Sequence, residues 1–394
     1  MDKRFLNICS PELRLLFRCV QQSRAAQNLK DGLIQETIDW QYVLTLVRYH
    51  QSGSLVYKTL SQVPELVPQE ILKALHREYK ENMARSLVMT GELVKICAVL
   101  ERQGIAYAVL KGIPLGYMLY GDLGYRVSGD LDILVWPEEL DKAVSLLEGM
   151  EFRREDPSFL TERGRKGWLA ETNHFTLHHK NGIAVELHWR LENNELSLPL
   201  AYVQGSLTNV MVAGHKISVM NKEELLLFLV LHGAKHGWAR VKWLTDIAAM
   251  IQCGGFDWKR VNRLAQCLEV RCVLNQALLL AGELLKVPLG EEFMAVAAQD
   301  KKARQLALAA MPIIATPVFN KNCVPYKLRY FAYKQYKFYL LRGWKRKISY
   351  IGNQFRPTEN DIRVITLPQC LYFLYYAIRP LAGVRRWLIE LTGR

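Results

Sequence analysis

A short acidic motif that runs into an apolar segment constrains the fold of this chain most. Asp130 and Asp132 are separated by one leucine and are followed at once by Ile133-Leu134-Val135, a pattern that predicts a β-strand. Alternate side chains of a strand lie on the same face, so the two carboxylates are expected to point together while the apolar residues enter the core. Ionised carboxylates held side by side repel each other, and a divalent cation is a common remedy. The motif therefore predicts a metal site on a sheet.

A third carboxylate is predicted on a second strand. Residues 173–190 have the pattern of a β-hairpin, because Asn181-Gly182 lies between two segments of alternating apolar residues. On the return strand Glu186 and His188 share one face, and the apolar residues share the other. An acid in mid-strand costs free energy unless it is solvated, paired or bound to metal. Three acids on adjacent strands would suit two metal ions that clamp the oxygens of an in-line displacement at phosphorus.

Each acidic position also has a plainer interpretation. An isolated Asp-x-Asp motif fits a solvated strand end, and Glu186 alone fits the partner of a surface arginine. The combination favours the metal site, because Lys111-Gly112 follows an apolar strand and a helical segment separates it from the Asp pair. Magnesium prefers oxygen ligands and completes its shell with water and substrate phosphates. We therefore expect Mg²⁺, or Mn²⁺ in its place, and phosphate chemistry.

The remaining pattern predicts an α/β (α+β) protein with a small mixed-sheet core between helical regions. The eight cysteines are scattered without a Cys-x-x-Cys motif, the first residues lack the apolar core of a signal peptide, and no apolar run approaches the ~18 residues that span a bilayer. We therefore expect a cytoplasmic protein. Four parts are predicted: an N-terminal helical region (1–100), the core (101–215), a helical domain that completes the cleft (216–310), and a basic, aromatic-rich helical region (311–394).

Four segments carry a resemblance to a known family: Val109-Leu-Lys-Gly112, Tyr120 to Arg126, Ser128-Gly-Asp-Leu-Asp132 and Glu186-Leu-His-Trp189. The chain resembles the DNA polymerase β-like nucleotidyltransferase superfamily and, within it, the bacterial family described as uncharacterised nucleotidyltransferases. The resemblance implies that Asp130 and Asp132 are metal ligands and that Glu186 is the third acid. It also implies a nucleoside triphosphate as substrate.

The phosphate-binding loop departs from the superfamily pattern. Many members carry Gly-Ser or Gly-Gly where this chain has Lys111-Gly112. Phosphate contacts are expected instead from these two residues, from Ser128 and from the N-terminus of the following helix, where amides and the helix dipole favour anions. Arg126 either binds phosphate or braces the carboxylates, and its forked guanidinium favours bracing. His188 is the remaining candidate for a nucleotide contact on this side of the cleft.

A second group of candidates follows the core. Residues 231–246 are predicted to be helical, and His236, Arg240 and Lys242 are expected to line the cleft opposite the carboxylates and to contact triphosphate or acceptor. The alternative is a polar helix end with Trp238 and Trp243 packed inward.

These observations predict a metal-dependent nucleotidyltransferase. It would move a nucleoside monophosphate from a triphosphate to an acceptor hydroxyl or other nucleophile, in a small molecule, a peptide or protein, or RNA, and release pyrophosphate. The alternative is an inactive nucleotidyltransferase fold that serves as a scaffold or a membrane-surface binding protein.

Positive charge is concentrated at the C-terminal end. Residues 321–394 hold fifteen Lys and Arg against three acids, in a chain of net charge +14, and aromatic residues lie between the charges. Such a segment fits a nucleic-acid backbone, an anionic membrane surface or a solvated helical face. All three interpretations stay open, and the second would place the protein at the inner face of the membrane.

Overall fold

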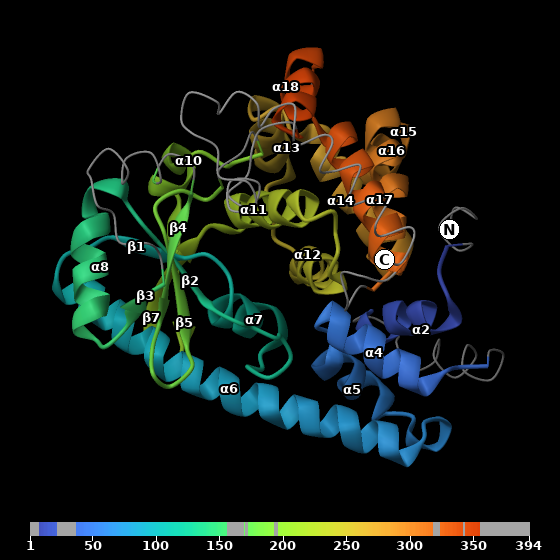
Figure 1. Ribbon diagram of the computed structural model, residues 1–394, viewed down its shortest axis with the longest axis horizontal. Helices are drawn as coiled ribbons and strands as arrows, with labels where there is room; N and C mark the ends of the chain where they lie inside the picture. Colours follow the sequence, from blue (N-terminus) through green and yellow to red (C-terminus); the bar gives the residue numbers. More distant parts are fainter. Residues whose placement is uncertain are drawn as a thin grey trace, which may run out of the picture. The chain divides into compact units, whose positions relative to one another are not determined.

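The chain forms two compact units, Met1–Pro317 and Val318–Arg394. The computed structural model describes residues 8–21, 37–155, 169, 172–192, 196–317, 324–341 and 343–354. The first unit combines helices with a seven-stranded mixed sheet (Figure 1). This confirms the predicted fold class. The four-part domain division stays a prediction.

In the described part of the chain before the sheet there are four helices: α2 (Pro11–Val20), α4 (Trp40–His50), α5 (Gly53–Leu60) and α6 (Gln69–Arg102), with a 3-10 turn η1 (Pro64–Leu66) before α6. Helix α6 has 34 residues. It contacts α5 near its beginning and, further along, helix α8 (Leu140–Gly149) and strand β7 (His215–Met220), so it passes beneath both the N-terminal helices and the sheet in Figure 1. One long helix therefore contacts both the N-terminal helices and the sheet.

The sheet has the strand order β3-β4-β5-β2-β1-β7-β6. Its remaining strands are β1 (Tyr107–Val109), β2 (Leu131–Val135), β3 (Arg153–Arg154), β4 (His174–His178), β5 (Ala184–His188) and β6 (Leu207–Val212). Strand β2 pairs parallel to β5 and antiparallel to β1. Strands β2 and β5 lie in the middle of the sheet, where both edges of each are hydrogen-bonded.

The predicted hairpin is confirmed. Strands β4 and β5 are antiparallel, and the chain reverses where the amide of His179 donates to the carbonyl of Ile183 at 2.9 Å. Gly182 has φ 81°, which glycine adopts without strain.

One face of β2 and β5 enters the main apolar core. The residues that alternate with the acids are fully or nearly fully buried against α6: Leu131, Ile133, Val135, Val185, Leu187 and Trp189. The opposite face is therefore left for the acids and His188, as the two-residue period predicts.

The other elements of the first unit are mostly helical: α7 (Ile113–Tyr120), η2 (Pro137–Glu139), α10 (Leu200–Gln204), α11 (Lys222–Lys235), α12 (Val241–Cys253), α13 (Trp258–Cys267), α14 (Arg271–Leu285), α15 (Glu291–Gln299) and α16 (Lys301–Ala315). The second unit contains α17 (Val324–Leu340) and α18 (Trp344–Gln354). Much of the basic segment, residues 355–394, lies outside the described residues. Of the helices in the described ranges, none is long and apolar enough to cross a membrane.

Helix α7 begins at the Lys111-Gly112 loop. Gly112 caps the helix with φ 76° and ψ −131°, and its carbonyl accepts a hydrogen bond from the amide of Gly116 at 3.0 Å. L-residues rarely adopt such a φ. A Cβ atom at this position would meet nothing closer than the carbonyl oxygen of Asp130 at 3.6 Å, so backbone conformation, and not space, requires glycine here.

We expect Gly112→Ala to lower the free energy of unfolding by about 1–3 kcal/mol, the usual cost of such backbone strain. Urea unfolding followed by circular dichroism measures it. Gly149→Ala is the matched control, because Gly149 has no positive φ and open space around the added methyl group. Equal effects of the two substitutions would contradict the assignment of strain to Gly112.

Candidate functional site

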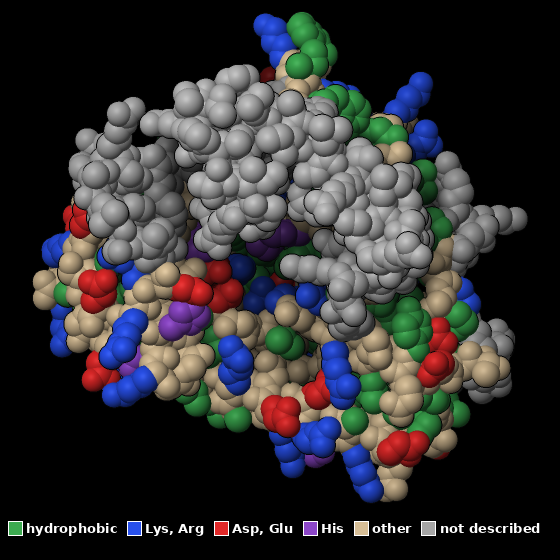
Figure 2. Space-filling model, in the orientation of Figure 1, with side chains coloured by type: hydrophobic (Ala, Val, Ile, Leu, Met, Phe, Trp, Pro, Cys, Tyr) green, Lys and Arg blue, Asp and Glu red, His purple; other side chains and the backbone are tan. Residues whose placement is uncertain are grey.

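The three predicted acids lie together on one face of the sheet. Asp132 on β2 is paired in register with Glu186 on β5, and Asp130 directly precedes β2. Each acid offers a carboxylate oxygen within 4.8 Å of the others. Figure 2 shows acidic, basic and histidine side chains gathered in a hollow of the surface near these strands. Parallel pairing of β2 with β5 therefore brings together residues that are far apart in the sequence.

Lys111 neutralises part of this negative charge. Its Nζ lies 3.1 Å from Oδ1 of Asp132, and the lysine side chain is only 18% exposed. Burial alone would lower the pKa of Lys111, but the carboxylates of Asp132, Asp130 and Glu186 raise it above its usual value. The lysine therefore stays charged beside the acids.

The two aspartates differ in their electrostatic surroundings. Burial and the neighbouring charge of Asp132 raise the pKa of Asp130 to about 6. Burial would also raise the pKa of Asp132, but Lys111 and His188 outweigh it and hold this pKa below its usual range. Of the two aspartates, Asp130 is thus the one whose charged form the repulsion disfavours.

His188 connects two of the acids. Its Nε2 atom lies 3.3 Å from Oδ1 of Asp132 and 3.5 Å from Oε2 of Glu186. Burial lowers the pKa of the imidazole, but its hydrogen bonds to these two carboxylates raise it overall.

The donor set fits a divalent cation. Oδ2 of Asp132 is buried and has no hydrogen-bond partner among the described residues, and an unpaired buried carboxylate oxygen costs free energy that a cation would recover. Asp130 lies at the same place, and burial, together with the charge of Asp132, raises its pKa. Three carboxylates are hard oxygen ligands of the kind that Mg²⁺ and Mn²⁺ prefer.

Arg126 supports the loops next to the acids. Its guanidinium forms a two-pronged ion pair with Asp246 on α12, with N–O distances of 3.0–3.1 Å, and both side chains are almost fully buried. It also donates to Oγ of Ser128 at 3.2 Å and to the carbonyl of Gly112 at 3.4 Å. The guanidinium therefore joins α12 to the Lys111-Gly112 loop and to the loop that leads into Asp130 and β2. Its carboxylate partner is Asp246, which sequence analysis missed, and not the Asp pair.

The candidates that follow the core do not form one surface. Lys242 reaches the acidic side, where its Nζ donates to the carbonyl of Val127 at 3.0 Å; burial and the charges of Arg126 and Lys111 lower its pKa to about 7. Arg240 instead lies over the ring of Tyr49 on α4, at 4.3 Å from the ring centre.

His236 at the end of α11 belongs to an aromatic cluster. Its ring centre lies 4.8 Å from that of His232 and 5.2 Å from that of Trp243. Trp238 is fully buried, as the alternative interpretation of this segment expected, whereas Trp243 remains partly exposed within the cluster.

A second buried ion-pair cluster lies close to Lys111. Glu192, which follows β5, pairs with Lys235 and lies 3.5 Å from Nδ1 of His232. Burial opposes its charge, but His232 and Lys235 lower the pKa of Glu192 to about 2. Lys111 and Asp132 both affect the pKa of His232, which places this cluster within electrostatic range of the acids. The sequence gives no local indication of Glu192, because its partners lie about 40 residues away on α11.

We expect Arg126→Ala to lower the free energy of unfolding by about 3–5 kcal/mol, because it leaves the buried Asp246 carboxylate without a partner. The paired substitution Arg126→Met with Asp246→Leu removes both charges and should be clearly less destabilising. Urea unfolding of both proteins tests this. If the single and the paired substitution cost the same, the ion pair is not the origin of the effect.

The pKa of Asp130 predicts a pH-dependent stability. Because the folded state raises this pKa to about 6, the protonated carboxyl stabilises the fold fully below the unfolded value near ~3.9, and this contribution is lost as the pH rises through 6. In metal-free protein near neutral pH, Asp130→Asn should therefore raise the free energy of unfolding by about 1–3 kcal/mol.

Asp132→Asn is the contrasting variant. It should lower the free energy of unfolding, because Lys111 and His188 would lose their carboxylate partner. Urea unfolding with a chelator, at neutral pH and in mildly acidic buffer, measures both variants. A gain for Asp130→Asn that does not shrink with falling pH would contradict the assignment.

Comparison with known proteins identifies the family of the chain. A solved structure, that of an antigenic nucleotidyltransferase-like protein from Paracoccidioides brasiliensis, is similar to part of the chain, with 18% sequence identity, a TM-score of 0.29, and coverage of 48% of this chain and 91% of that one. No curated protein matches the chain. The family model described as "Uncharacterised nucleotidyltransferase" matches residues 36–286, a range that includes all three acids, Lys111 and Asp246. The chain therefore belongs to the uncharacterised nucleotidyltransferase family.

Proposed function

We propose that this protein transfers a nucleoside monophosphate group from a nucleoside triphosphate to an acceptor nucleophile and releases pyrophosphate. The observation that carries the proposal is the trio of Asp130, Asp132 and Glu186, whose carboxylate oxygens lie within 4.8 Å of one another and include a buried oxygen that no described residue hydrogen-bonds. Membership of the nucleotidyltransferase family supports the reaction class. The acids would hold Mg²⁺, or Mn²⁺.

The contribution of each acid follows from its position. A divalent cation bound here would neutralise charge on the attacking and leaving oxygens at phosphorus. Asp132 is fixed by its strand and by contacts to Lys111 and His188, so it can hold a ligand in one place without reorganising. Glu186 faces it from the neighbouring strand and is more exposed, which suits contact with an incoming acceptor. Such catalysis consists mainly of positioning and charge neutralisation.

The phosphates would meet the positive groups beside the acids. Lys111 is a charged group on a flexible stem, and such a side chain serves as a point charge for phosphate. The N-terminus of α7 begins one residue later at Gly112, where unpaired amides favour anions. Ser128 is held by Arg126 and is buried, so its hydroxyl supports the loop and we assign it no direct phosphate contact.

A second candidate function is a nucleotidyltransferase fold without turnover. The contact of Lys111 with Asp132 favours it, because an internal cation already satisfies one ligand oxygen. Such a scaffold would act in the cytoplasm through other surfaces. The basic residues 321–394 are its expected contact with an anionic membrane surface or a nucleic acid, and this stays a prediction.

Calorimetric titration with each of the four common nucleoside triphosphates, in the presence of Mg²⁺, separates the two functions. The wild-type protein should bind at least one of them, and Asp130→Asn should weaken Mg²⁺-dependent binding and transfer by at least about a hundredfold, because loss of a metal ligand exceeds the usual cost of losing an outer contact.

Glu155→Gln is the matched control. Glu155 pairs with His178 at 2.9 Å, but it is exposed and not part of the acid trio, so its substitution should leave binding unchanged. Absence of binding by the wild-type protein with all four triphosphates would favour the scaffold.

A further inference from the structure

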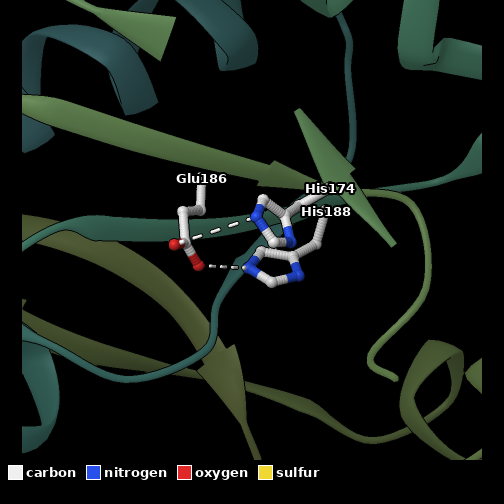
Figure 3. A group of neighbouring side chains, drawn as sticks. All are labelled: His174, Glu186 and His188. Atoms are coloured by element: carbon white, nitrogen blue, oxygen red, sulfur yellow. Dashed lines mark ion pairs between the residues drawn. The ribbon is translucent and has the colours of Figure 1, made fainter. Parts of the chain in front are cut away.

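A second group of possible metal ligands lies beside the three acids. His174 on β4 and His188 on β5 are directly opposite each other in the antiparallel pair, and Glu186 precedes His188 by two residues on the same face. Figure 3 shows the two imidazole rings side by side with the carboxylate of Glu186 in front of both. All three residues come from paired strands, so the backbone register fixes their spacing.

The distances fit a single bound cation. Nε2 of His174 lies 3.8 Å from Oε1 of Glu186, and Nε2 of His188 lies 3.5 Å from Oε2. In a tetrahedral zinc site with bonds of about 2.0–2.1 Å, ligand atoms are about 3.3–3.4 Å apart. Small side-chain rotations would close the difference, and all three ligand atoms already lie within 4.8 Å of one another.

The ligand types differ from those of the neighbouring acid site. Carboxylates alone suit Mg²⁺, whereas imidazole favours borderline transition-metal ions such as Zn²⁺. We propose that His174, Glu186 and His188 bind a divalent transition-metal ion, with Zn²⁺ the best fit, at a site that adjoins the acid trio and shares Glu186 with it. Three protein ligands leave one position open, as in zinc sites that also bind water or a substrate group.

The second ring nitrogen of His188 faces Asn173. This nitrogen, Nδ1, lies 3.5 Å from the side-chain amide nitrogen of Asn173. A metal-bound histidine usually donates its second ring N–H to an acceptor, which orients the ring. The same Asn173 nitrogen donates to the carbonyl of Leu191 at 3.3 Å, so a half turn that offered the amide oxygen to Nδ1 would give up this hydrogen bond. Asn173, which directly precedes β4, would therefore orient His188 only in exchange for its bond to Leu191.

Glu186 makes the two sites interdependent. Its Oε1 atom faces His174 and its Oε2 atom faces His188, while the same residue belongs to the acid trio. A transition-metal ion held by the histidines would draw Glu186 toward β4 and compete with the acid site for it. The inference does not rest on nucleotidyl transfer, because an inactive scaffold would bind the ion equally well.

Cobalt absorption tests this site in the full-length protein. Co²⁺ replaces Zn²⁺ in nitrogen and oxygen sites and gives visible bands whose intensity rises with fewer ligands, whereas thiolate ligands add an intense ultraviolet band. We expect visible bands without the thiolate band, displacement by equimolar Zn²⁺, and no displacement by a large excess of Mg²⁺. A spectrum dominated by thiolate bands, no visible band at all, or displacement by Mg²⁺ would overturn the proposal.

Two variants locate the site. His174→Ala should abolish the bands and weaken Zn²⁺ binding by at least about tenfold, since even outer contacts of metal ligands are worth that much. His178→Ala is the matched control, because His178 lies four residues along the same strand and pairs with a carboxylate, Glu155, without a second histidine; the bands should persist. Bands that survive His174→Ala, or vanish with His178→Ala, would refute the assignment.

Asp130→Asn separates this inference from the proposed function. It should remove Mg²⁺-dependent nucleotide binding while the Co²⁺ bands remain, because Asp130 does not belong to the histidine group. Thermal unfolding of each variant checks that it is folded. If Asp130→Asn removes the Co²⁺ bands from folded protein, cobalt binds at the acid trio and the separate site is refuted.

Discussion

The parallel pairing of β2 with β5 is the constraint on which the site depends. Their register places Asp132 opposite Glu186 and sends the residues between them into the core against α6. Because strand side chains alternate, a slip of one residue would bury Glu186 and expose its apolar neighbours. Burial of the alternating apolar residues therefore stabilises this register, and the register holds the carboxylates of Asp132 and Glu186 close together although they repel each other. Central position in the sheet adds to this rigidity, since both strands are hydrogen-bonded on both edges.

Local periodicity was sufficient to predict the fold class, the hairpin and the meeting of the three acids. Asp130, Asp132 and Glu186 each lie in a short segment whose alternation identifies their face. The partners that hold the site could not be found in this way. Asp246 meets Arg126 across 120 residues of sequence, and helical periodicity in α12 gives no indication that this particular acid is buried beside an arginine. His174 was overlooked for a related reason: its importance arises only from its pairing with His188.

Local periodicity also could not predict where His236, Arg240 and Lys242 lie. His236, Arg240 and Lys242 are close in sequence, but a turn with Gly237 and Trp238 at positive φ separates α11 from α12. Each side chain consequently faces a different neighbour: the histidine an aromatic cluster, Arg240 the ring of Tyr49, and Lys242 the loop before the Asp pair. Spacing within one helix predicts which residues share a face, and it does not apply across such a turn.

The balance of charge around the acids explains why a divalent ion suits this site. The charge of Arg126 is cancelled by Asp246, and that of Lys235 by Glu192. Three carboxylates then face Lys111, and Lys242 contributes only in part, because burial lowers its pKa to about 7. The three ionised acids and Lys111 together carry a charge of −2, and the partial positive charges of Lys242 and of His188, whose pKa is raised, offset part of it. A divalent cation would offset the rest. Burial, and after it the charge of Asp132, raises the pKa of Asp130, so protonation of this carboxyl also removes part of the charge. The buried ion pairs Arg126–Asp246 and Lys235–Glu192 therefore influence the charge of the site, because they cancel two positive charges close to it. Neither Asp246 nor Glu192 belongs to the acid trio.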